Sequence, residues 1–138
     1  MLYINNKKLN ITKEEIFVGP FINNGIKGYC IEIQLRFTNE DNVKGYLNLD
    51  AGFEKSKDIN IFVNREFKGV PFTNGNTFFS FEVFDTENFY DSEIENPINL
   101  SLKNIKDNKF EVEFEVNDEL IKIKYNGYLN IVEKEFDE

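Results

Sequence analysis

The segment Tyr29-Cys-Ile-Glu-Ile-Gln-Leu-Arg-Phe37 alternates apolar and non-apolar side chains without a break. Its apolar residues all share one parity, and the residues between them are Cys30, Glu32, Gln34 and Arg36. A repeat of two residues is typical of a β-strand with one buried face and one face in water. Such strands belong to antiparallel sheets that are covered on one side. Similar alternation recurs along most of the chain, which predicts an all-β, antiparallel fold.

Turn residues divide the first part of the chain into further strands. The quartet Asn-Asn-Lys-Lys at 5–8 separates the apolar segments 2–4 and 9–11, so these two segments are predicted to form a hairpin. Asn23-Asn24-Gly25 contains residues that tolerate a positive φ, and it predicts a turn just before the strand 29–37.

A second hairpin is predicted between the strand 29–37 and the segment 43–49, across a loop at 38–42. A five-residue loop would pair Phe37 with Val43 and Ile33 with Leu47, so that apolar residues share a face. In that register Gly45 would lie opposite Leu35.

The middle of the chain reads as a solvated loop, an edge strand and an aromatic strand. Polar residues fill much of 51–58, which predicts the loop, and Pro71 lacks a backbone N–H, which keeps the segment 67–72 away from the centre of a sheet. A turn is predicted at 73–76. It leads into the segment 77–84, where Phe residues on both parities predict a strand buried on both faces.

The last third of the chain predicts a three-stranded meander. A two-residue turn at Asn117-Asp118 would place Val112 opposite Ile123 and Phe114 opposite Ile121. A second turn is predicted at 125–127, where Gly127 could adopt a positive φ. The segment 133–138 is predicted to be a frayed acidic tail.

The same register gives the meander a charged outer face. It pairs Glu113 with Lys122 and Glu111 with Lys124. These carboxylates, with Glu115, could bind a basic partner, but the opposing lysines favour an ordinary salt-bridged surface.

Composition sets the class of protein. The 138 residues suit one domain spanning 1–138, and 15 Phe and 6 Tyr supply a large apolar area for its core. We therefore predict a single antiparallel β-sandwich, or a partly open barrel, of about eight to ten strands joined by hairpins and meanders. The chain has no apolar run near the roughly 18 to 20 residues that a membrane helix needs, and no signal peptide pattern. A single cysteine fits a reducing compartment, so a cytoplasmic location is predicted.

Missing residue types exclude several kinds of active site. The chain has no histidine, which excludes histidine-based triads and histidine metal sites, and one cysteine excludes a zinc thiolate cluster. Cys30 has no histidine to activate it. No glycine-rich phosphate loop occurs. Paired carboxylates could support glycosidase chemistry, but so acidic a chain offers such pairs by chance. We predict no enzyme activity and no cofactor or metal.

Acidic charge is concentrated in the middle of the chain. The net charge is −9, and residues 69–102 hold six carboxylates and no Lys or Arg. Within this stretch the segment 85–97 is predicted to be a long acidic loop with aromatic residues placed where a loop would expose them. The candidate partner-binding residues are Asp85, Glu87, Phe89, Tyr90, Asp91, Glu93 and Glu95.

Aromatic anchors among uncompensated acids suit a basic protein partner. We therefore predict a small intracellular inhibitor or immunity-type protein that masks a basic partner, such as a toxin or nuclease. The negative charge argues against direct binding to nucleic acid. The alternatives for the loop are a Ca²⁺ site and a merely solvated connection, in which case the recognition surface would be the face of Glu32, Gln34 and Arg36. The alternative for the protein is a carbohydrate-binding or small-ligand-binding β-sandwich.

Overall fold

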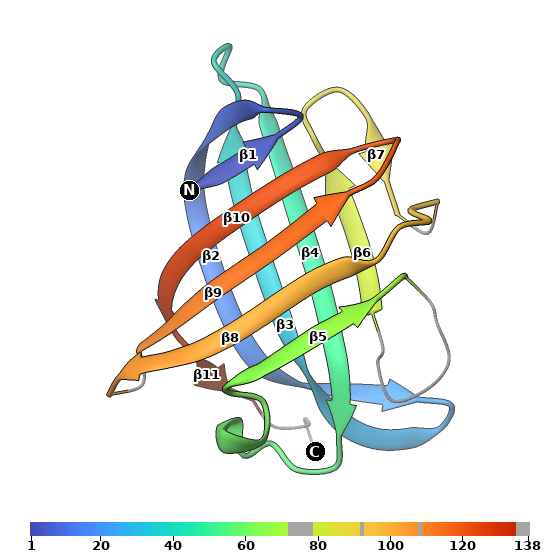
Figure 1. The fold of residues 1–138 in the computed structure, drawn as a ribbon, viewed down its shortest axis with the longest axis vertical. Coiled ribbons are helices and arrows are strands. Elements are labelled where there is room, and N and C mark those ends of the chain that lie inside the picture. Colours follow the sequence, from blue (N-terminus) through green and yellow to red (C-terminus); the bar gives the residue numbers. More distant parts are fainter. Residues whose placement is uncertain (72–78, 92, 108, 135–138) are drawn as a thin grey trace.

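The computed structural model of the chain describes residues 1–71, 79–91, 93–107 and 109–134 (Figure 1). The described part contains eleven strands and one 3-10 helix. The strands are β1 (Leu2–Ile4), β2 (Lys7–Asn23), β3 (Ile26–Thr38), β4 (Lys44–Glu54), β5 (Arg65–Gly69), β6 (Phe79–Phe84), β7 (Phe89–Tyr90), β8 (Ile98–Lys106), β9 (Lys109–Asn117), β10 (Lys122–Asn130) and β11 (Val132–Glu133). The helix η1 covers Ile59–Ile61.

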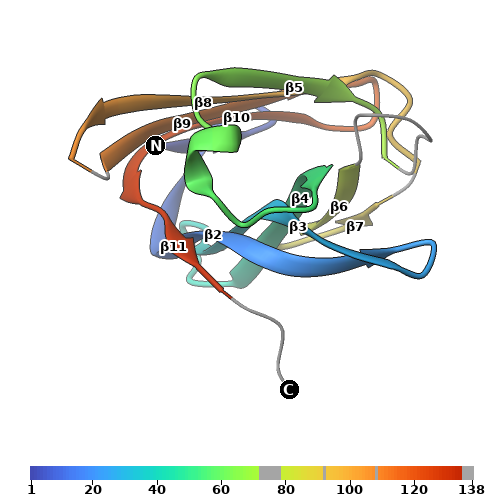
Figure 2. The same cartoon turned by 90° about the horizontal axis from the view of Figure 1, so that it is seen from below.

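The strands lie in two layers with the core between them (Figures 1 and 2). We call β5, β8, β9, β10 and β1 the front layer, and β2, β3, β4, β6 and β7 the back layer. One hydrogen-bonded path runs through both in the order β5-β8-β9-β10-β1-β2-β3-β4-β6-β7. β2 joins the layers, because its first residues pair with β1 and the rest pair with β3. The predicted all-β fold is confirmed, and the described sheet does not close on itself, since β5 and β7 end the path.

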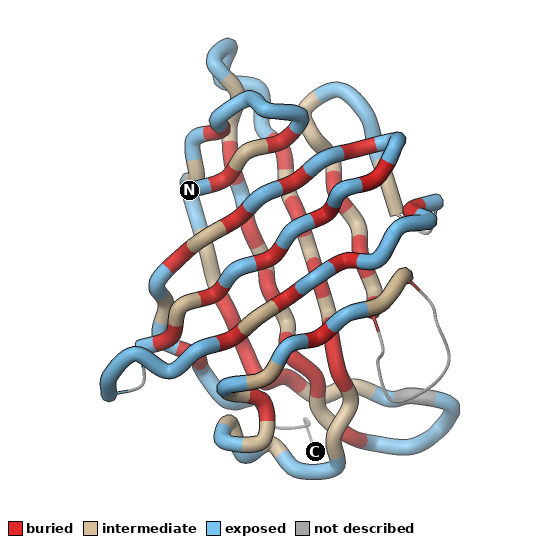
Figure 3. The backbone as a smooth tube through the Cα atoms, viewed as in Figure 1, coloured by how far each residue is buried: buried red, intermediate tan, exposed pale blue. Residues whose placement is uncertain are grey.

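Alternation along each strand builds the core. Figure 3 shows buried and exposed residues following one another along most strands. In β3, Ile31, Ile33, Leu35 and Phe37 are buried, as the sequence predicts. Cys30 is also buried, although it lies on the other parity.

Several predicted elements are confirmed. The opening hairpin forms between β1 and β2 with Leu2 opposite Leu9, and the turn before β3 lies at Asn24 and Gly25, both with positive φ. β5 is an edge strand, as Pro71 predicts. β6 buries only one face, however, because Ser80 and the other outward residues of this strand are partly exposed. The predicted turn at 73–76 and residues 77 and 78 lie outside the described residues.

The predicted register of the second hairpin is wrong by two residues. Phe37 pairs with Gly45, and Leu35 pairs with Leu47. The side-chain Oδ1 of Asn39 accepts the backbone N–H groups of Asp41 and Val43, both at 2.9 Å, so Val43 belongs to the loop. A shift of two residues keeps the same side chains on the same face.

Part of the predicted solvated loop at 51–58 is strand. β4 continues to Glu54, and Ala51 is fully buried. The strand passes through Gly52, whose φ of 74° accompanies an irregularity in the pairing of β3 with β4. The loop that follows leads to η1, where the Asp58 side chain caps the first turn by accepting the N–H of Asn60.

The predicted turn at Asn117-Asp118 is also wrong. β9 and β10 pair Val116 with Ile123 and Glu115 with Lys124, and the loop between them comprises 118–121. Asp118 is only 5% exposed, and the backbone N–H of Asp118 donates to the carbonyl of Ile121. The register therefore moves by four residues, which again leaves each side chain on its predicted face.

Gly127 lies inside β10 and not in a turn, opposite Val112. A Cβ at this position would come within 2.1 Å of the Tyr125 hydroxyl oxygen. That hydroxyl donates to Glu14 at 2.6 Å. The glycine therefore leaves room for the Tyr125 side chain, and the C-terminal meander consists of β8, β9 and β10.

The predicted frayed tail is partly ordered. β11 pairs in parallel with β2, with Glu133 opposite Val18, and the Lys134 N–H donates to the Val18 carbonyl at 2.8 Å. The Lys134 ammonium lies 3.5 Å from the centre of the Phe17 ring. Residues 135–138 lie outside the described residues.

Candidate functional site

The first half of the predicted acidic loop is a tight hairpin. β7 pairs with β6, and the turn between them comprises 85–88. The Asp85 Oδ1 accepts the backbone N–H groups of Glu87 and Asn88 at 2.9 and 2.7 Å. The prediction of a long loop is therefore wrong for this half of the segment. The sequence does not reveal β7, because its two residues, Phe89 and Tyr90, are too few to show alternation.

The second half of this loop is fixed to the β9–β10 loop. Ile94 is buried in the core, and the backbone N–H groups of Glu95 and Asn96 donate to the Asp118 Oδ1 at 3.1 and 2.8 Å. Burial alone would raise the pKa of Asp118, but these two donors and the N–H of Leu120 bring it below its usual value. The five carboxylates of the loop form no metal-binding group among the described residues, so the Ca²⁺ alternative gains no support.

The hairpin brings Phe89 onto the outer face of the back layer. Phe89 pairs with Phe84, Phe84 pairs with Tyr46, and Tyr46 pairs with Arg36, so the four side chains follow one line across four strands. The rings of Tyr46 and Phe84 are 6.4 Å apart, and the Arg36 guanidinium lies 5.5 Å from the Tyr46 ring. Phe89 is 48% exposed, as predicted, whereas Tyr90 is half-buried and packs against the core.

A line of carboxylates runs beside these rings. Glu82 accepts a hydrogen bond from the Asn48 amide at 2.8 Å, and Asn48 in turn accepts one from Arg36 at 3.1 Å. Two residues beyond Asn48 along β4, Asp50 lies opposite Glu32 of β3. We call the rings of Tyr46, Phe84 and Phe89 together with the carboxylates of Glu82, Asp50 and Glu32 the acidic-aromatic face.

The carboxylates of this face are poorly compensated. Burial, followed by the charges of Glu32 and Glu82, raises the pKa of Asp50 to about 7. Burial also raises the pKa of Glu32, although the Lys134 ammonium opposes this change. A neutral or half-neutral carboxyl here could be ionised by an incoming cation, so the face favours a positively charged ligand.

Cys30 lies beside the same carboxylates. Its sulfur and the carboxylate oxygens of Glu32 and Asp50 lie within 4.8 Å of one another, and this is the one such group of possible metal ligands in the described part of the chain. Burial, followed by the charges of Asp50 and Glu32, raises the pKa of the Cys30 thiol. Since only the thiolate attacks or coordinates strongly, this environment opposes both nucleophilic and metal-binding roles.

The predicted lysine partners of the front-layer carboxylates are wrong. Glu111 accepts a hydrogen bond from the Tyr128 hydroxyl at 3.0 Å, and Glu113 accepts one from the Asn126 amide at 2.9 Å. Across β10 Glu115 faces Lys124, and across β8 Glu111 faces Lys103, a lysine that the predicted register does not include.

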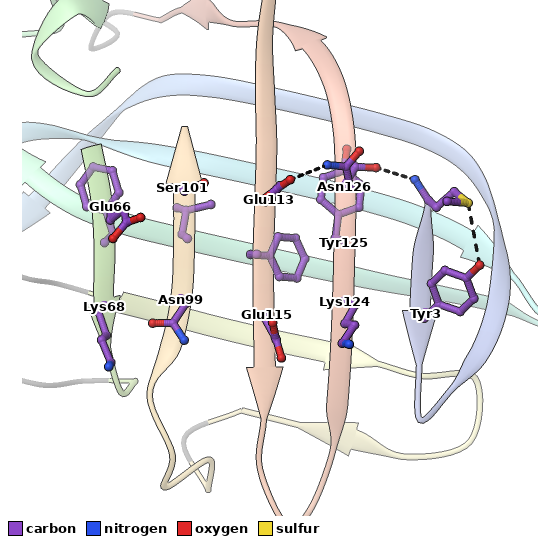
Figure 4. A pocket seen from close by; sticks show the side chains of 14 residues that line it. Tyr3, Glu66, Lys68, Asn99, Ser101, Glu113, Glu115, Lys124, Tyr125 and Asn126 are labelled. Atoms are coloured by element: carbon purple, nitrogen blue, oxygen red, sulfur yellow. Dashed lines mark hydrogen bonds between the residues drawn. The ribbon is translucent and has the colours of Figure 1, made fainter. Parts of the chain in front are cut away.

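A hollow of about 490 Å³ lies on the outer face of the front layer (Figure 4). Its wall includes polar side chains from β5, β8, β9 and β10 and the ring of Tyr3 from β1. The sequence does not reveal this hollow, because Tyr3 and Lys68 meet the C-terminal strands only through long-range pairing. The aromatic line of the back layer escapes prediction for the same reason.

No protein family, curated protein or solved structure matches this chain. Within the described ranges no helix is long and apolar enough to cross a lipid bilayer. The geometry of the two faces is therefore the basis for assigning a function.

Proposed function

We propose that this chain is a non-catalytic interaction protein that binds and masks a basic protein partner through its acidic-aromatic face. An intracellular inhibitor or immunity-type protein directed against a toxin or nuclease fits this role. The observation that carries the proposal is the line of Tyr46, Phe84 and Phe89 beside carboxylates that lack sufficient positive charge.

This arrangement provides the two kinds of side chain that a protein interface uses, charged groups and aromatic rings. Exposed carboxylates steer a basic partner and raise the association rate, whereas desolvated aromatic rings slow dissociation. The proposal joins two surfaces that the sequence treats as alternatives. Pairing of β7 with β6 places Phe89 opposite Phe84, on the face that also carries Glu32 and Arg36.

The chemistry of the face supports a binding role over a catalytic one. The buried thiol of Cys30 has a raised pKa, and the chain contains no histidine to act as a base. Apart from the Cys30 thiol, the side chains near these carboxylates include aromatic rings and the Asn48 amide, which can contact a partner surface but are not bases.

The proposal is tested first by capture and then by rate measurements. The immobilised chain is exposed to lysate of its own organism at about 0.1 M and about 0.5 M salt, and the captured protein is identified and purified. Association and dissociation rates are then measured for the wild type, for Glu32→Lys/Glu82→Lys and for Phe89→Ala.

The two variants should affect different rates. Charge reversal should slow association by tenfold or more at low salt and flatten its salt dependence, because steering acts over roughly 10 Å at 0.1 M salt. Phe89→Ala should raise the dissociation rate roughly thirtyfold, which corresponds to about 2 kcal/mol, because it removes an anchor ring from the interface. Tyr90 is unsuitable for this test, because its truncation would also damage the core.

Matched controls lie on the front layer. Asp107→Lys/Glu111→Lys makes the same charge change, and Tyr128→Ala removes an aromatic side chain that is 54% exposed. If the two control variants alter the rates as much as the two test variants do, or if neither test variant alters them, the acidic-aromatic face is not the recognition surface.

A further inference from the structure

The hollow on the front layer is remote from the acidic-aromatic face, since the two lie on opposite outer surfaces of the sandwich (Figures 2 and 4). Its volume of about 490 Å³ falls within the usual range for sites that bind small molecules. It crosses five strands, and at about 4.8 Å between strands its floor is about 19 Å wide. This shape suits an elongated ligand of more than one ring.

Strand pairing places the polar side chains of the hollow in two rows. Figure 4 shows the rows one beside the other. The first row is Lys68, Asn99, Glu115, Lys124 and Tyr3, in strand order from β5 to β1. The second row is Glu66, Ser101, Glu113 and Asn126. Hydrogen-bond donors and acceptors therefore alternate across the floor.

Most of these side chains are available to a ligand. Glu113 already accepts the Asn126 amide. The Tyr3 hydroxyl donates to the Met1 sulfur at 3.8 Å. The side chains of the remaining polar residues make no hydrogen bond or ion pair with any described residue, and this includes Glu115 and Lys124, which lie directly opposite each other. A sheet surface this rich in unused donors and acceptors can exchange bound water for the polar groups of a ligand.

Charge in the hollow is nearly balanced. Three glutamates and two lysines line it, a side-chain net charge of −1. Phosphate-rich ligands need an excess of basic contacts, which this balance does not offer. Tyr3 adds an amphipathic ring at the β1 end, where an apolar ligand face could pack.

We propose that this hollow binds a neutral oligosaccharide. Glu113 and Glu115 accept hydrogen bonds from sugar hydroxyls, and Lys68, Lys124 and Asn99 donate to them. The Tyr3 ring covers the apolar face of one sugar unit. This binding is independent of the partner-masking role and uses no residue of the acidic-aromatic face.

The test is an NMR titration of the isotopically labelled full chain with neutral hexasaccharides of α-1,4-glucose, β-1,4-glucose, β-1,4-mannose and β-1,4-N-acetylglucosamine. At about 10 mM ligand, a site with a Kd near 1 mM is mostly occupied. At least one probe should shift the backbone signals of Asn99, Glu115 and Lys124 and leave those of Asp50 and Glu82 unchanged. Its affinity should change less than about twofold between low and high salt, because the ligand is uncharged.

Variants separate the hollow from the rest of the sheet. Tyr3→Ala and Glu115→Gln should each weaken binding by about tenfold, since each removes a direct contact. Tyr128→Ala changes an exposed tyrosine on the same layer outside the hollow, and it should change the affinity less than about twofold. Glu115→Gln keeps the side-chain shape, so it remains informative if Tyr3→Ala fails to fold.

Three outcomes would overturn the proposal. One is that none of the four hexasaccharides shifts the hollow. Another is that inositol hexakisphosphate, the anionic probe, shifts it more strongly than any neutral sugar does. The third is that Tyr128→Ala weakens binding as much as Glu115→Gln. None of these outcomes bears on the acidic-aromatic face, whose test changes residues of the back layer and measures a salt-dependent rate; Tyr128→Ala is only a control in both tests.

Discussion

Asp118 fixes two loops at once. The residue is 5% exposed, and its carboxylate accepts the backbone N–H groups of Glu95, Asn96 and Leu120. Its role as a buried acceptor cannot be read from the sequence, because Asn-Asp is also a common turn pair and nothing marks its remote partners. Side-chain identity therefore predicts the presence of this loop but not its length.

Asp118→Ala should destabilise the fold by about 1 to 3 kcal/mol, because three partly buried N–H groups lose a charged acceptor. Asp118→Asn keeps one acceptor oxygen and should cost less. The free energies of unfolding come from urea denaturation. A change below about 0.5 kcal/mol for Asp118→Ala would mean that water replaces the carboxylate and that the loop is not fixed from inside.

The faces of the strands are predictable from the sequence, but their pairing is not. Parity alone identifies the buried residues of β9 and, apart from Gly28 and Cys30, those of β3, because the side-chain repeat of two residues is local. Register depends on how each loop closes. Asn39 and Asp118 close theirs with side-chain hydrogen bonds, which moves the two registers by two and four residues without changing either face.

In the candidate site, too, local properties are predictable from the sequence and strand pairing is not. Exposure of Phe89 is predictable from its acidic surroundings, whereas its place beside Phe84 requires the pairing of β6 with β7. Glycine is equally ambiguous in sequence. Asn126-Gly127 has the composition of a hairpin turn, yet the strand continues through it because Tyr125 needs the space.

Gly127→Ala distinguishes these two roles of the glycine. The added Cβ would collide with the Tyr125 hydroxyl and disturb its bond to Glu14, so we expect a loss of about 1 to 3 kcal/mol. In a Tyr125→Phe background the nearest atom is gone, and the same substitution should cost measurably less. The four proteins form a double-mutant cycle in urea. Equal costs in the two backgrounds would indicate backbone strain and a turn.

Across the whole molecule, the two outer surfaces of the sandwich carry different chemistry. The front layer mixes lysines with glutamates around its hollow, whereas the back layer gathers rings and carboxylates with few cations. The concentration of acid is visible in the sequence between 69 and 102, but Asp50 and Glu32 join it only through folding. Assembly of like charges on one face has an energetic cost, which should appear in the pH dependence of stability.

Asp50 should make the protein less stable as the pH rises from about 4 to 7. Its pKa is about 7 in the folded protein, against about 3.9 for an unfolded chain, so the folded state binds more protons within this window. The stabilisation is complete below pH 4 and is lost as the carboxyl ionises beside Glu32 and Glu82. Asp50→Asn removes that ionisation, so its melting temperature should fall less over this range and exceed that of the wild type at pH 8.

Asp118→Asn is the matched control, because the pKa of Asp118 is lowered and its contribution disappears only as the pH falls below about 4. Melting temperatures measured from pH 4.5 to 8 at fixed ionic strength decide the matter. Glu32, whose pKa is also raised, should leave Asp50→Asn a smaller residual slope of the same sign. Parallel profiles for the wild type and Asp50→Asn would show that Asp50 is solvated and ionised throughout. In that case, relief of charge repulsion at Asp50 would add nothing to the affinity for a basic partner.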